Sequence, residues 1–372
     1  MATSTIHALV VDDSALYRKF VKSVLNEIQD VEVLGTAING RIGLEKIQSL
    51  QPDLITLDLE MPELDGLGLL RELSDRGIEV PTIMISSLTA EGAKATNEAL
   101  QLGAFDFVLK PIGKSPDESR EQLKRDLAPK INASLSTLYG RKKTSRQLAN
   151  RSSLQPSSAE VIHNLAQRAG KPRPQPEIVG IGVSTGGPVA LNRMIPKLPA
   201  NFPCPILLVQ HMPPMFTKSL ADDLNRHSAI EVMEAEDGME PTAGQVLIAP
   251  GGSQMRVVEM NGRPVVQVTN DPPERSCRPS VDYLFRSIAH SYGDRAVGAI
   301  LTGMGDDGTL GCKLMKRAGA MIITQDEQSC VVYGMPRSVF EAGISDQVVS
   351  LENMASSLTA AVGQTPGQVG IV

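Results

Sequence analysis

The chain contains no tryptophan, and aromatic residues make up only 3% of its 372 residues. Hydrophobic residues nevertheless account for 41% of the chain, so its interior must be built mainly from aliphatic side chains. A chain of this length can form two domains with cores of ordinary size.

Long hydrophobic runs are also missing. No stretch approaches the roughly 20 apolar residues that a membrane-spanning helix needs. The first residues, "MATSTIHALVVDD", lack a basic region, and two aspartates interrupt their apolar run, which is unlike a signal peptide. We therefore expect a cytoplasmic protein without membrane insertion.

Cysteine is scarce and unpaired in the sequence. No Cys-x-x-Cys motif occurs, and the four cysteines all lie in the C-terminal half: Cys204, Cys277, Cys312 and Cys330. This pattern is typical of free thiols in a reducing compartment and unlike a disulfide framework or a structural zinc site.

Excess positive charge is confined to one segment. Residues 1–140 carry a net charge of −7, residues 141–176 carry +7, and residues 177–372 carry −6. Neither acidic body has the basic surface of a nucleic-acid-binding protein, so we expect no nucleic-acid partner. The basic segment is rich in serine and proline, which predicts a flexible linker over 127–176.

Two series of alternating strand and helix patterns predict the fold class. Alternation of this kind implies parallel sheets with helices on both faces. We expect an α/β fold of two doubly wound parallel-sheet domains, at 1–126 and 177–372. The expected strands are 7–11, 31–37, 52–59, 80–86 and 105–110, followed by 178–183, 205–210, 245–250, 264–269, 296–301 and 321–325.

Polar side chains stand at the ends of the predicted N-terminal strands. They are Asp12, Asp13, Asp58, Ser86 and Lys110. If the strands are parallel, these side chains converge on one edge of the sheet. An oxygen-only carboxylate cluster suits Mg²⁺, and a lysine with a hydroxyl can bind a phosphoryl group. The alternative is helix capping by Asp13 or Ser14 with a solvated lysine.

Four segments over residues 6–125 resemble the two-component receiver domain, which has a flavodoxin-like fold. They are "VVDDSALYRK", "LDLEMPELDG", "ISSLT" and "FDFVLKP". The resemblance implies that Asp58 accepts the phosphoryl group and holds Mg²⁺ together with Asp12 and Asp13.

The same resemblance implies roles for three more receiver residues. Ser86 would bond the phosphoryl group, and Lys110 would pair with it through a cis Lys110–Pro111 peptide. Phe107 would occupy the switch-aromatic position.

A serine stands where a buried strand should turn into a helix, in "GVSTGGP". Gly182 to Gly186 match G-x-S-x-G, a motif that projects a nucleophilic hydroxyl above a sheet. The dinucleotide-binding pattern G-x-G-x-x-G fails because its third glycine falls on Thr185. A structural turn with Ser184 as helix N-cap is the alternative.

A nucleophilic serine needs a base and an orienting carboxylate. His211 directly follows the strand pattern "ILLVQ", which places it on the same sheet edge as Ser184. The glycine-rich segment "LTGMGDDG" offers Asp306 and Asp307, and the residue pattern alone does not choose between them. The order serine, histidine, aspartate differs from that of α/β-hydrolases.

The segments "GVSTGGP", "VQHMP", "RPSVD" and "LTGMGDDG" resemble the Rossmann-like effector domain of the chemotaxis methylesterases, the CheB family. The resemblance implies Ser184 as nucleophile, His211 as base and Asp307 as orienting carboxylate. Thr185 and Met304 would line the site, with the Met304 backbone N–H as oxyanion donor. No cofactor is implied in the esterase site.

The resemblance also implies a function. The protein would be a serine esterase that hydrolyses glutamate γ-methyl esters on chemoreceptor cytoplasmic domains and deamidates specific glutamines. A chemotaxis histidine kinase would be the phosphodonor. We expect the receiver to cover the Ser184 edge through residues 90–125. The rival hypothesis is a response regulator whose output domain binds DNA or a partner without chemistry.

Overall fold

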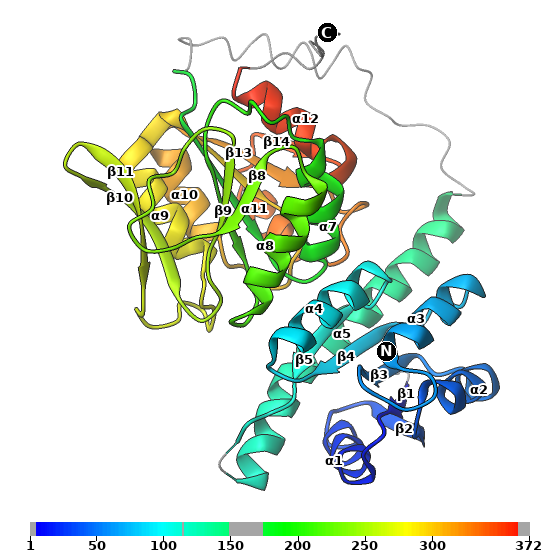
Figure 1. Cartoon of the computed structure of the whole chain (residues 1–372). Helices are drawn as coiled ribbons and strands as arrows, with labels where there is room; N and C mark the ends of the chain where they lie inside the picture. Colours follow the sequence, from blue (N-terminus) through cyan, green and yellow to red (C-terminus); the bar gives the residue numbers. More distant parts are fainter. Residues whose placement is uncertain (1–4, 114, 149–173, 364–372) are drawn as a thin grey trace, which may run out of the picture.

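The computed structural model describes residues 5–113, 115–148 and 174–363. It contains two α/β domains in contact, one drawn blue to cyan and one green to red (Figure 1). Each is built on a parallel sheet, so the predicted fold class is confirmed. Within the described ranges, no helix has the length and apolar character needed to cross a bilayer.

The N-terminal domain is a five-stranded parallel sheet in the order β2-β1-β3-β4-β5. This is the flavodoxin-like order expected of a receiver. Its strands are β1 Ile6–Val11, β2 Val31–Ala37, β3 Leu54–Asp58, β4 Thr82–Ser86 and β5 Asp106–Leu109. Its helices are α1 Ala15–Leu25, α2 Gly40–Leu50, α3 Gly66–Asp75, α4 Ala90–Gln101 and α5 Pro116–Leu148.

Successive residues of β1 pack on opposite faces of this sheet, as the period of a strand requires. Ala8 and Val10 join a core with α1 and α5, whereas Leu9 and Val11 join a core with α2, α3 and α4. The strands are buried on both faces for this reason, which explains their continuous apolar runs.

Helix α5 corrects the predicted domain boundary. The flexible linker was expected to begin at residue 127, but the helix continues to Leu148. Leu127 and Ile131 are fully buried against the α1 side of the sheet, so hydrophobic packing extends the helix past the predicted end of the domain. The remainder of the expected linker, 149–173, lies outside the described residues.

The C-terminal domain is a seven-stranded parallel sheet in the order β14-β13-β12-β6-β7-β9-β8. Its strands are β6 Ile178–Val183, β7 Ile206–Gln210, β8 Glu231–Glu234, β9 Gln245–Ile248, β12 Ala296–Ile300, β13 Met321–Gln325 and β14 Gln347–Val349. The central strand β6 is buried along its whole length.

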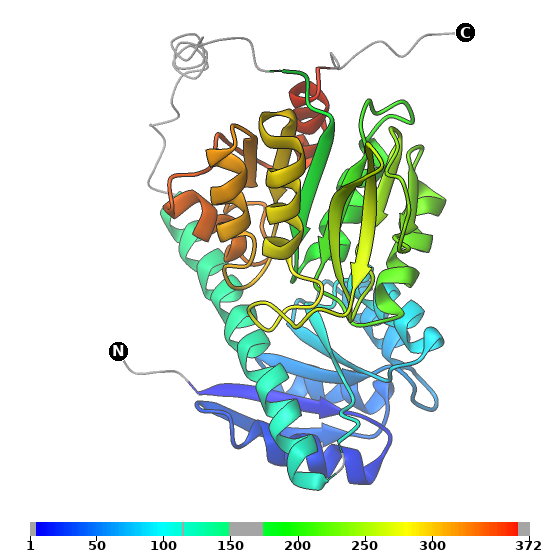
Figure 2. The ribbon, with the colours of Figure 1, turned by 90° about the vertical axis from the view of Figure 1, so that its left-hand side faces the viewer.

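Helices cover both faces of this second sheet (Figure 2). One face packs against α7 Gly187–Met194, α8 Phe216–His227 and α12 Leu351–Ala361. The other packs against α9 Val281–Tyr292, α10 Thr309–Arg317 and α11 Met335–Glu341. Two short 3₁₀ turns are η1 Ile195–Lys197 and η2 Gly293–Arg295.

One predicted strand does not join the parallel sheet. The run expected at 264–269 is part of β11 Arg263–Thr269, which pairs antiparallel with β10 Gln254–Met260. Asn261 and Gly262 connect the two strands with positive φ angles of 53° and 76°, the conformation that Asn-Gly favours in a two-residue hairpin turn. Strands β8, β10 and β14 and helices α11 and α12 were not predicted.

The two domains meet through the predicted face of the receiver. Helix α4 packs against α7 and α8, and the ring of Phe107 in β5 stacks on the ring of Phe216 with 4.8 Å between centroids. One cluster of buried apolar side chains therefore runs from the receiver into the second domain. The expectation that residues 90–125 contact that domain is confirmed.

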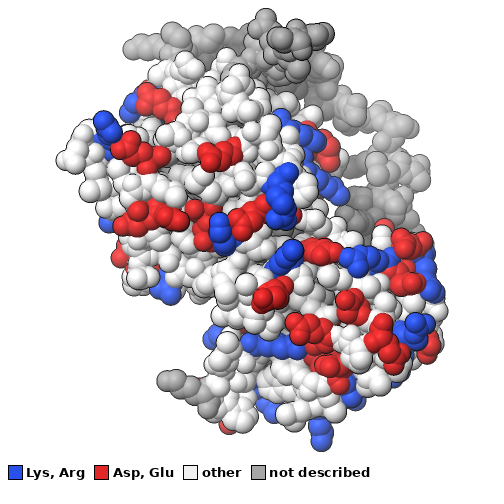
Figure 3. Space-filling view, in the orientation of Figure 1, with Lys and Arg blue, Asp and Glu red and all other residues white. Residues whose placement is uncertain are grey.

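Charged side chains of both signs are interspersed over the two domains on the face seen in Figure 3. No broad basic surface forms on this face of the described residues.

Candidate active site

The serine, histidine and aspartate singled out in the sequence come together at one edge of the second sheet. Ser184 follows β6, His211 follows β7 and Asp307 lies in the loop after β12. The strand order reverses between β6 and β12, so this edge is the topological switch point, where ligands of open α/β sheets bind.

The turn after β6 presents Ser184. Gly186 has φ of 77°, a left-handed conformation that glycine adopts without steric cost. A Cβ on Gly187 would lie 1.9 Å from the Gln210 Oε1 atom, so a larger residue there would displace the Gln210 side chain. Ser184 is not the N-cap of α7, because Gly186 holds that position. Ser184 is half-buried and lines the cavity at this edge.

His211 is held by Asp307. The Nε2 atom of His211 lies 2.8 Å from Asp307 Oδ2, and the backbone N–H of His211 donates to the Val183 carbonyl at 3.2 Å. Asp307 therefore orients the ring, while the backbone of His211 is anchored to the end of β6. A carboxylate on Nε2 keeps the proton on that nitrogen and leaves Nδ1 as the basic atom.

The structure distinguishes Asp307 from Asp306. Asp307 is 3% exposed, and its Oδ1 accepts hydrogen bonds from the Ser280 hydroxyl and the backbone N–H of Asp282. Asp306 is exposed and pairs with Arg275. Only Asp307 therefore reaches the imidazole.

Hydrogen bonds shift the pKa values of Asp307 and His211. Burial raises the pKa of Asp307, but the bonds from His211 and from backbone N–H groups outweigh it and hold the pKa below its ordinary value. Burial lowers the pKa of His211, yet its bond to Asp307 and the nearby Cys277 raise it to about 9. The ring therefore favours its protonated form at neutral pH.

Ser184 and His211 line the same cavity, but the described residues show no hydrogen bond between the Ser184 hydroxyl and the ring. The atom beside Nδ1 is instead the Cys277 Sγ, at 3.8 Å. Met304 also lines the cavity, and its role as oxyanion donor stays a prediction.

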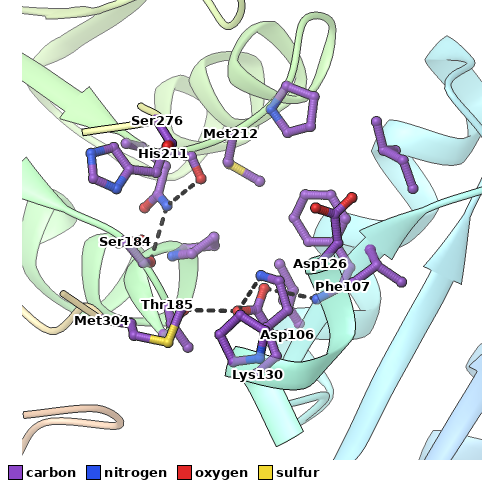
Figure 4. Close-up of a pocket in the computed structure, with 18 of the residues that line it drawn as sticks. Asp106, Phe107, Asp126, Lys130, Ser184, Thr185, His211, Met212, Ser276 and Met304 are labelled. Atoms are coloured by element: carbon purple, nitrogen blue, oxygen red, sulfur yellow. Dashed lines mark hydrogen bonds and ion pairs between the residues drawn. The ribbon is translucent and has the colours of Figure 1, made fainter. Parts of the chain in front are cut away.

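The cavity has a volume of about 850 Å³ and is lined by both domains. Figure 4 shows Ser184 and His211 on one side and Asp106 and Phe107 of the receiver on the other. The Thr185 hydroxyl donates to Asp106 Oδ2 at 2.8 Å. The receiver thus contacts the residue next to the candidate nucleophile.

Asp106 also contacts α5. Its Oδ2 atom lies 2.7 Å from the Lys130 Nζ atom, and the Asp106 side chain is buried. Lys130 belongs to the part of α5 that the sequence assigned to a flexible linker. This part of the helix therefore helps to close the active-site cavity.

The predicted acidic cluster forms in the receiver. Ligand oxygens of Asp12, Asp13 and Asp58 lie within 4.8 Å of one another. Among the described residues, the buried Asp12 Oδ2 has no hydrogen-bond partner, as expected of an atom that a cation would satisfy. These residues fit Mg²⁺, which accepts carboxylate oxygens and offsets their repulsion.

Lys110 faces the same cluster. Its Nζ atom lies 2.9 Å from Asp58 Oδ1 and 3.7 Å from Asp12 Oδ2. Burial raises the pKa of Asp58 to about 6 although Lys110 opposes the shift. Asp58 therefore remains ionised at neutral pH, which a nucleophile toward a phosphodonor requires.

One expectation for the receiver is wrong. The Lys110–Pro111 peptide is trans, and the cis peptide bond among the described residues is Arg278–Pro279. Trans is the more stable isomer of an X–Pro bond unless surrounding contacts favour cis. The Ser86 hydroxyl accepts a hydrogen bond from Thr96 at 2.8 Å, and its bond to a phosphoryl group on Asp58 stays a prediction.

Three residues at the site were missed or left without a role. Ser280, inside "RPSVD", supports Asp307 and caps α9. Cys277, just before that motif, touches His211. Asp106 reaches Thr185. The signal for Asp106 was a carboxylate within the apolar strand "FDFVLK", since such a group needs a partner when buried.

Both domains match models of known protein families. Residues 179–358 match the CheB methylesterase family model and residues 8–122 match the response regulator receiver domain model. The solved Thermotoga maritima CheB methylesterase catalytic domain is 43% identical and covers 50% of this chain and 99% of that chain, with a TM-score of 0.49.

Two curated relatives are similar over nearly the whole chain, and both are named protein-glutamate methylesterase/protein-glutamine glutaminase. The Desulfotalea psychrophila protein is 46% identical over 96% of this chain and 98% of its own. The Symbiobacterium thermophilum protein is 44% identical over 96% of this chain and 98% of its own. Since this similarity covers nearly the whole chain, the chain belongs to the CheB methylesterase family and carries a response regulator receiver domain.

Proposed function

We propose that this chain hydrolyses glutamate γ-methyl esters on the cytoplasmic domains of chemoreceptors and deamidates specific receptor glutamines. We further propose that phosphorylation of Asp58 activates it. The observation that carries the proposal is the His211–Asp307 pair beside Ser184, in a cavity that the receiver closes.

The chemistry follows from the positions of the side chains. Ser184 attacks the ester carbonyl, and His211 accepts its proton on Nδ1 while Asp307 holds Nε2. His211 then returns the proton to methanol, and water hydrolyses the acyl-enzyme by the same route. The Met304 backbone N–H stabilises the oxyanion, a contribution on the order of 3 kcal/mol for one donor in such a site.

The proposed regulation follows from the contact between the domains. A receptor helix must reach Ser184, but Asp106 and Phe107 line the same cavity from the receiver. Phosphorylation of Asp58 adds charge beside Lys110, which is four residues beyond Asp106 on the chain. A change there that weakens the β5 contacts with Thr185 and Phe216 opens the cavity.

Mg²⁺ bound at the acidic cluster would supply the charge that offsets the phosphoryl group. Asp12, Asp13 and Asp58 are the residues that would hold it. Lys110 already pairs with Asp58 and would pair with the phosphoryl oxygens after transfer. The proposed phosphodonor is the chemotaxis histidine kinase.

The test is methanol release from methylated chemoreceptor membranes, with and without a phosphodonor. We expect stimulation of the wild type by the donor and no release from Ser184→Ala, whose circular dichroism should match the wild type. Release by Ser184→Ala near the wild-type rate would exclude the serine mechanism.

A further inference from the structure

Cys277 lies beside Nδ1 of His211, the nitrogen that would accept the Ser184 proton. The proposed reaction gives Cys277 no role. Its Sγ atom lies 3.8 Å from His211 Nδ1, the atom that must accept the proton of Ser184. The side chain is half-buried and so partly accessible to solvent. The other three cysteines are buried.

Several hydrogen bonds hold the loop that carries Cys277. The backbone N–H groups of Glu274 and Cys277 each donate to the carbonyl of the other residue, at 3.1 and 2.7 Å. The Gln254 side chain donates to the Cys277 carbonyl at 3.3 Å, and Arg275 bonds Asp282 at 3.1 Å. The thiol is therefore held beside the ring by the fold.

Donor atoms of His211, Cys277 and Asp307 lie within 4.8 Å of one another. Imidazole nitrogen and thiolate sulfur suit zinc, whereas the oxygen-only receiver cluster suits magnesium. The site therefore combines the ligand types of a zinc centre with the catalytic base.

The geometry points to a zinc-binding site formed by His211 Nδ1 and Cys277 Sγ, and we propose that Zn²⁺ bound there inhibits the esterase. A tetrahedral zinc ion with bonds of about 2.0 Å to nitrogen and about 2.3 Å to sulfur holds its two donors about 3.5 Å apart. The observed 3.8 Å requires only a small movement of either side chain.

Asp307 remains on the far side of the ring. It accepts the Nε2–H, as carboxylates commonly do behind zinc-bound histidines, and so keeps Nδ1 free to bind the metal. Binding deprotonates the thiol and removes the Nδ1 proton of the protonated ring, so two protons pass to solvent at neutral pH, while water completes the coordination of the metal. Zinc then occupies the electron pair that would accept the Ser184 proton, and hydrolysis stops.

The experiment uses the full-length chain with excess Mg²⁺, which occupies the receiver cluster. Zn²⁺ binding is measured by competition with a chromogenic zinc indicator, and methanol release is measured over the same zinc range. We expect one zinc ion to bind and to inhibit, with activity restored by a zinc-selective chelator. Inhibition is expressed against the zinc-free activity of each variant.

Cys277→Ser is the informative variant and Cys330→Ser, which changes a buried thiol elsewhere, is its control. We expect the zinc concentration for half-inhibition to rise at least about tenfold in Cys277→Ser, because a thiolate ligand is lost, and to stay unchanged in Cys330→Ser. Co²⁺ in place of zinc should give a thiolate-to-cobalt absorption band in the wild type that Cys277→Ser lacks.

Equal zinc affinity in Cys277→Ser and wild type would overturn the site, as would a cobalt complex without the thiolate band. Zinc that binds through Cys277 and leaves activity unchanged would overturn the inhibition. The proposed inhibition rests on the proposed function. The zinc-indicator measurement and the cobalt absorption band report metal binding and do not depend on esterase activity. A chain without esterase activity that still shows the band would refute the proposed function and leave the metal site standing.

Discussion

The Thr185 hydroxyl, one residue after the candidate nucleophile, donates a 2.8 Å hydrogen bond to Asp106 of the receiver. Lys130 of α5 lies on the same carboxylate oxygen at 2.7 Å. The next receiver residue, Phe107, stacks on Phe216. The receiver therefore reaches the active site through adjacent residues of β5, one polar and one aromatic.

Asp106→Ala should raise the esterase activity of the unphosphorylated chain. The substitution leaves the Thr185 hydroxyl and the Lys130 ammonium without their acceptor, and a buried bond to a charged group contributes about 1.5–3 kcal/mol. If that contact holds the closed arrangement, basal activity rises about 10- to 100-fold, as measured by methanol release without a donor.

Asp53→Ala is the control for that variant, because Asp53 bonds His7 at the far end of β1 and is remote from the interface. It should leave basal activity unchanged. A folded Asp106→Ala protein with basal activity at or below that of the wild type would show that this contact does not inhibit the enzyme.

Asp307→Asn should lower the rate of ester hydrolysis by about 10³- to 10⁴-fold, because the ring loses the carboxylate that sets its tautomer and stabilises its charge. Asp306→Asn should remain close to wild type, since an exposed ion pair contributes only about 0–1 kcal/mol. Steady-state kinetics of both variants tests which of the two aspartates orients the ring. The reverse ranking would assign the orienting role to Asp306.

The activity of the unphosphorylated enzyme should rise with pH through the alkaline range. His211 has a pKa of about 9, and only its neutral form accepts the Ser184 proton. Profiles of kcat/KM against pH, together with NMR titration of the ring, measure this pKa. Cys277→Ser should move the midpoint toward neutrality because the thiol helps to raise the pKa. A midpoint below pH 7 in the wild type would contradict the expectation.

The same ionisation predicts the pH dependence of stability. The folded-state pKa of His211 lies above the ordinary value of 6.5, so the protonated ring stabilises the fold. That contribution is complete below about pH 6.5 and is lost as the pH rises through about 9. Urea unfolding of wild type and His211→Ala should show a difference in the free energy of unfolding that shrinks over this window.

Asp58→Asn should retain basal activity and lose stimulation by acetyl phosphate, because no carboxylate remains to accept the phosphoryl group. The variant keeps a side chain of similar size beside Lys110, so the receiver should stay folded. Methanol release with and without the donor checks this expectation. Full stimulation of Asp58→Asn would place the regulation elsewhere.

Much of this protein follows from its sequence through local rules. Short Val/Ile/Leu runs alternating with helical spacing determine two parallel sheets, because a strand covered on both faces must be apolar throughout. Parallel strands bring their carboxyl ends to one edge. Residues at strand ends, such as Asp12 and Asp58 in one domain and Ser184 and His211 in the other, were thus assigned to shared sites before any contact was known.

Other features depend on contacts between segments distant in the chain, and only the tertiary structure decided them. Asp307 and Asp306 are adjacent and chemically identical, yet backbone N–H groups at the start of α9 surround only Asp307. The extension of α5 beyond residue 126 depends on burial of Leu127 and Ile131. Local patterns carry no information about such partners.

The contact between the domains likewise depends on segments that are distant in the chain. The sequence indicates which receiver face is used, because that face adjoins the switch residues, but it does not pair Asp106 with Thr185 or Phe107 with Phe216. The position of Cys277 beside His211 is likewise a product of loop packing. Sequence periodicity determines which side of an element is buried, whereas the identity of the partner side chain is settled only when the domains pack.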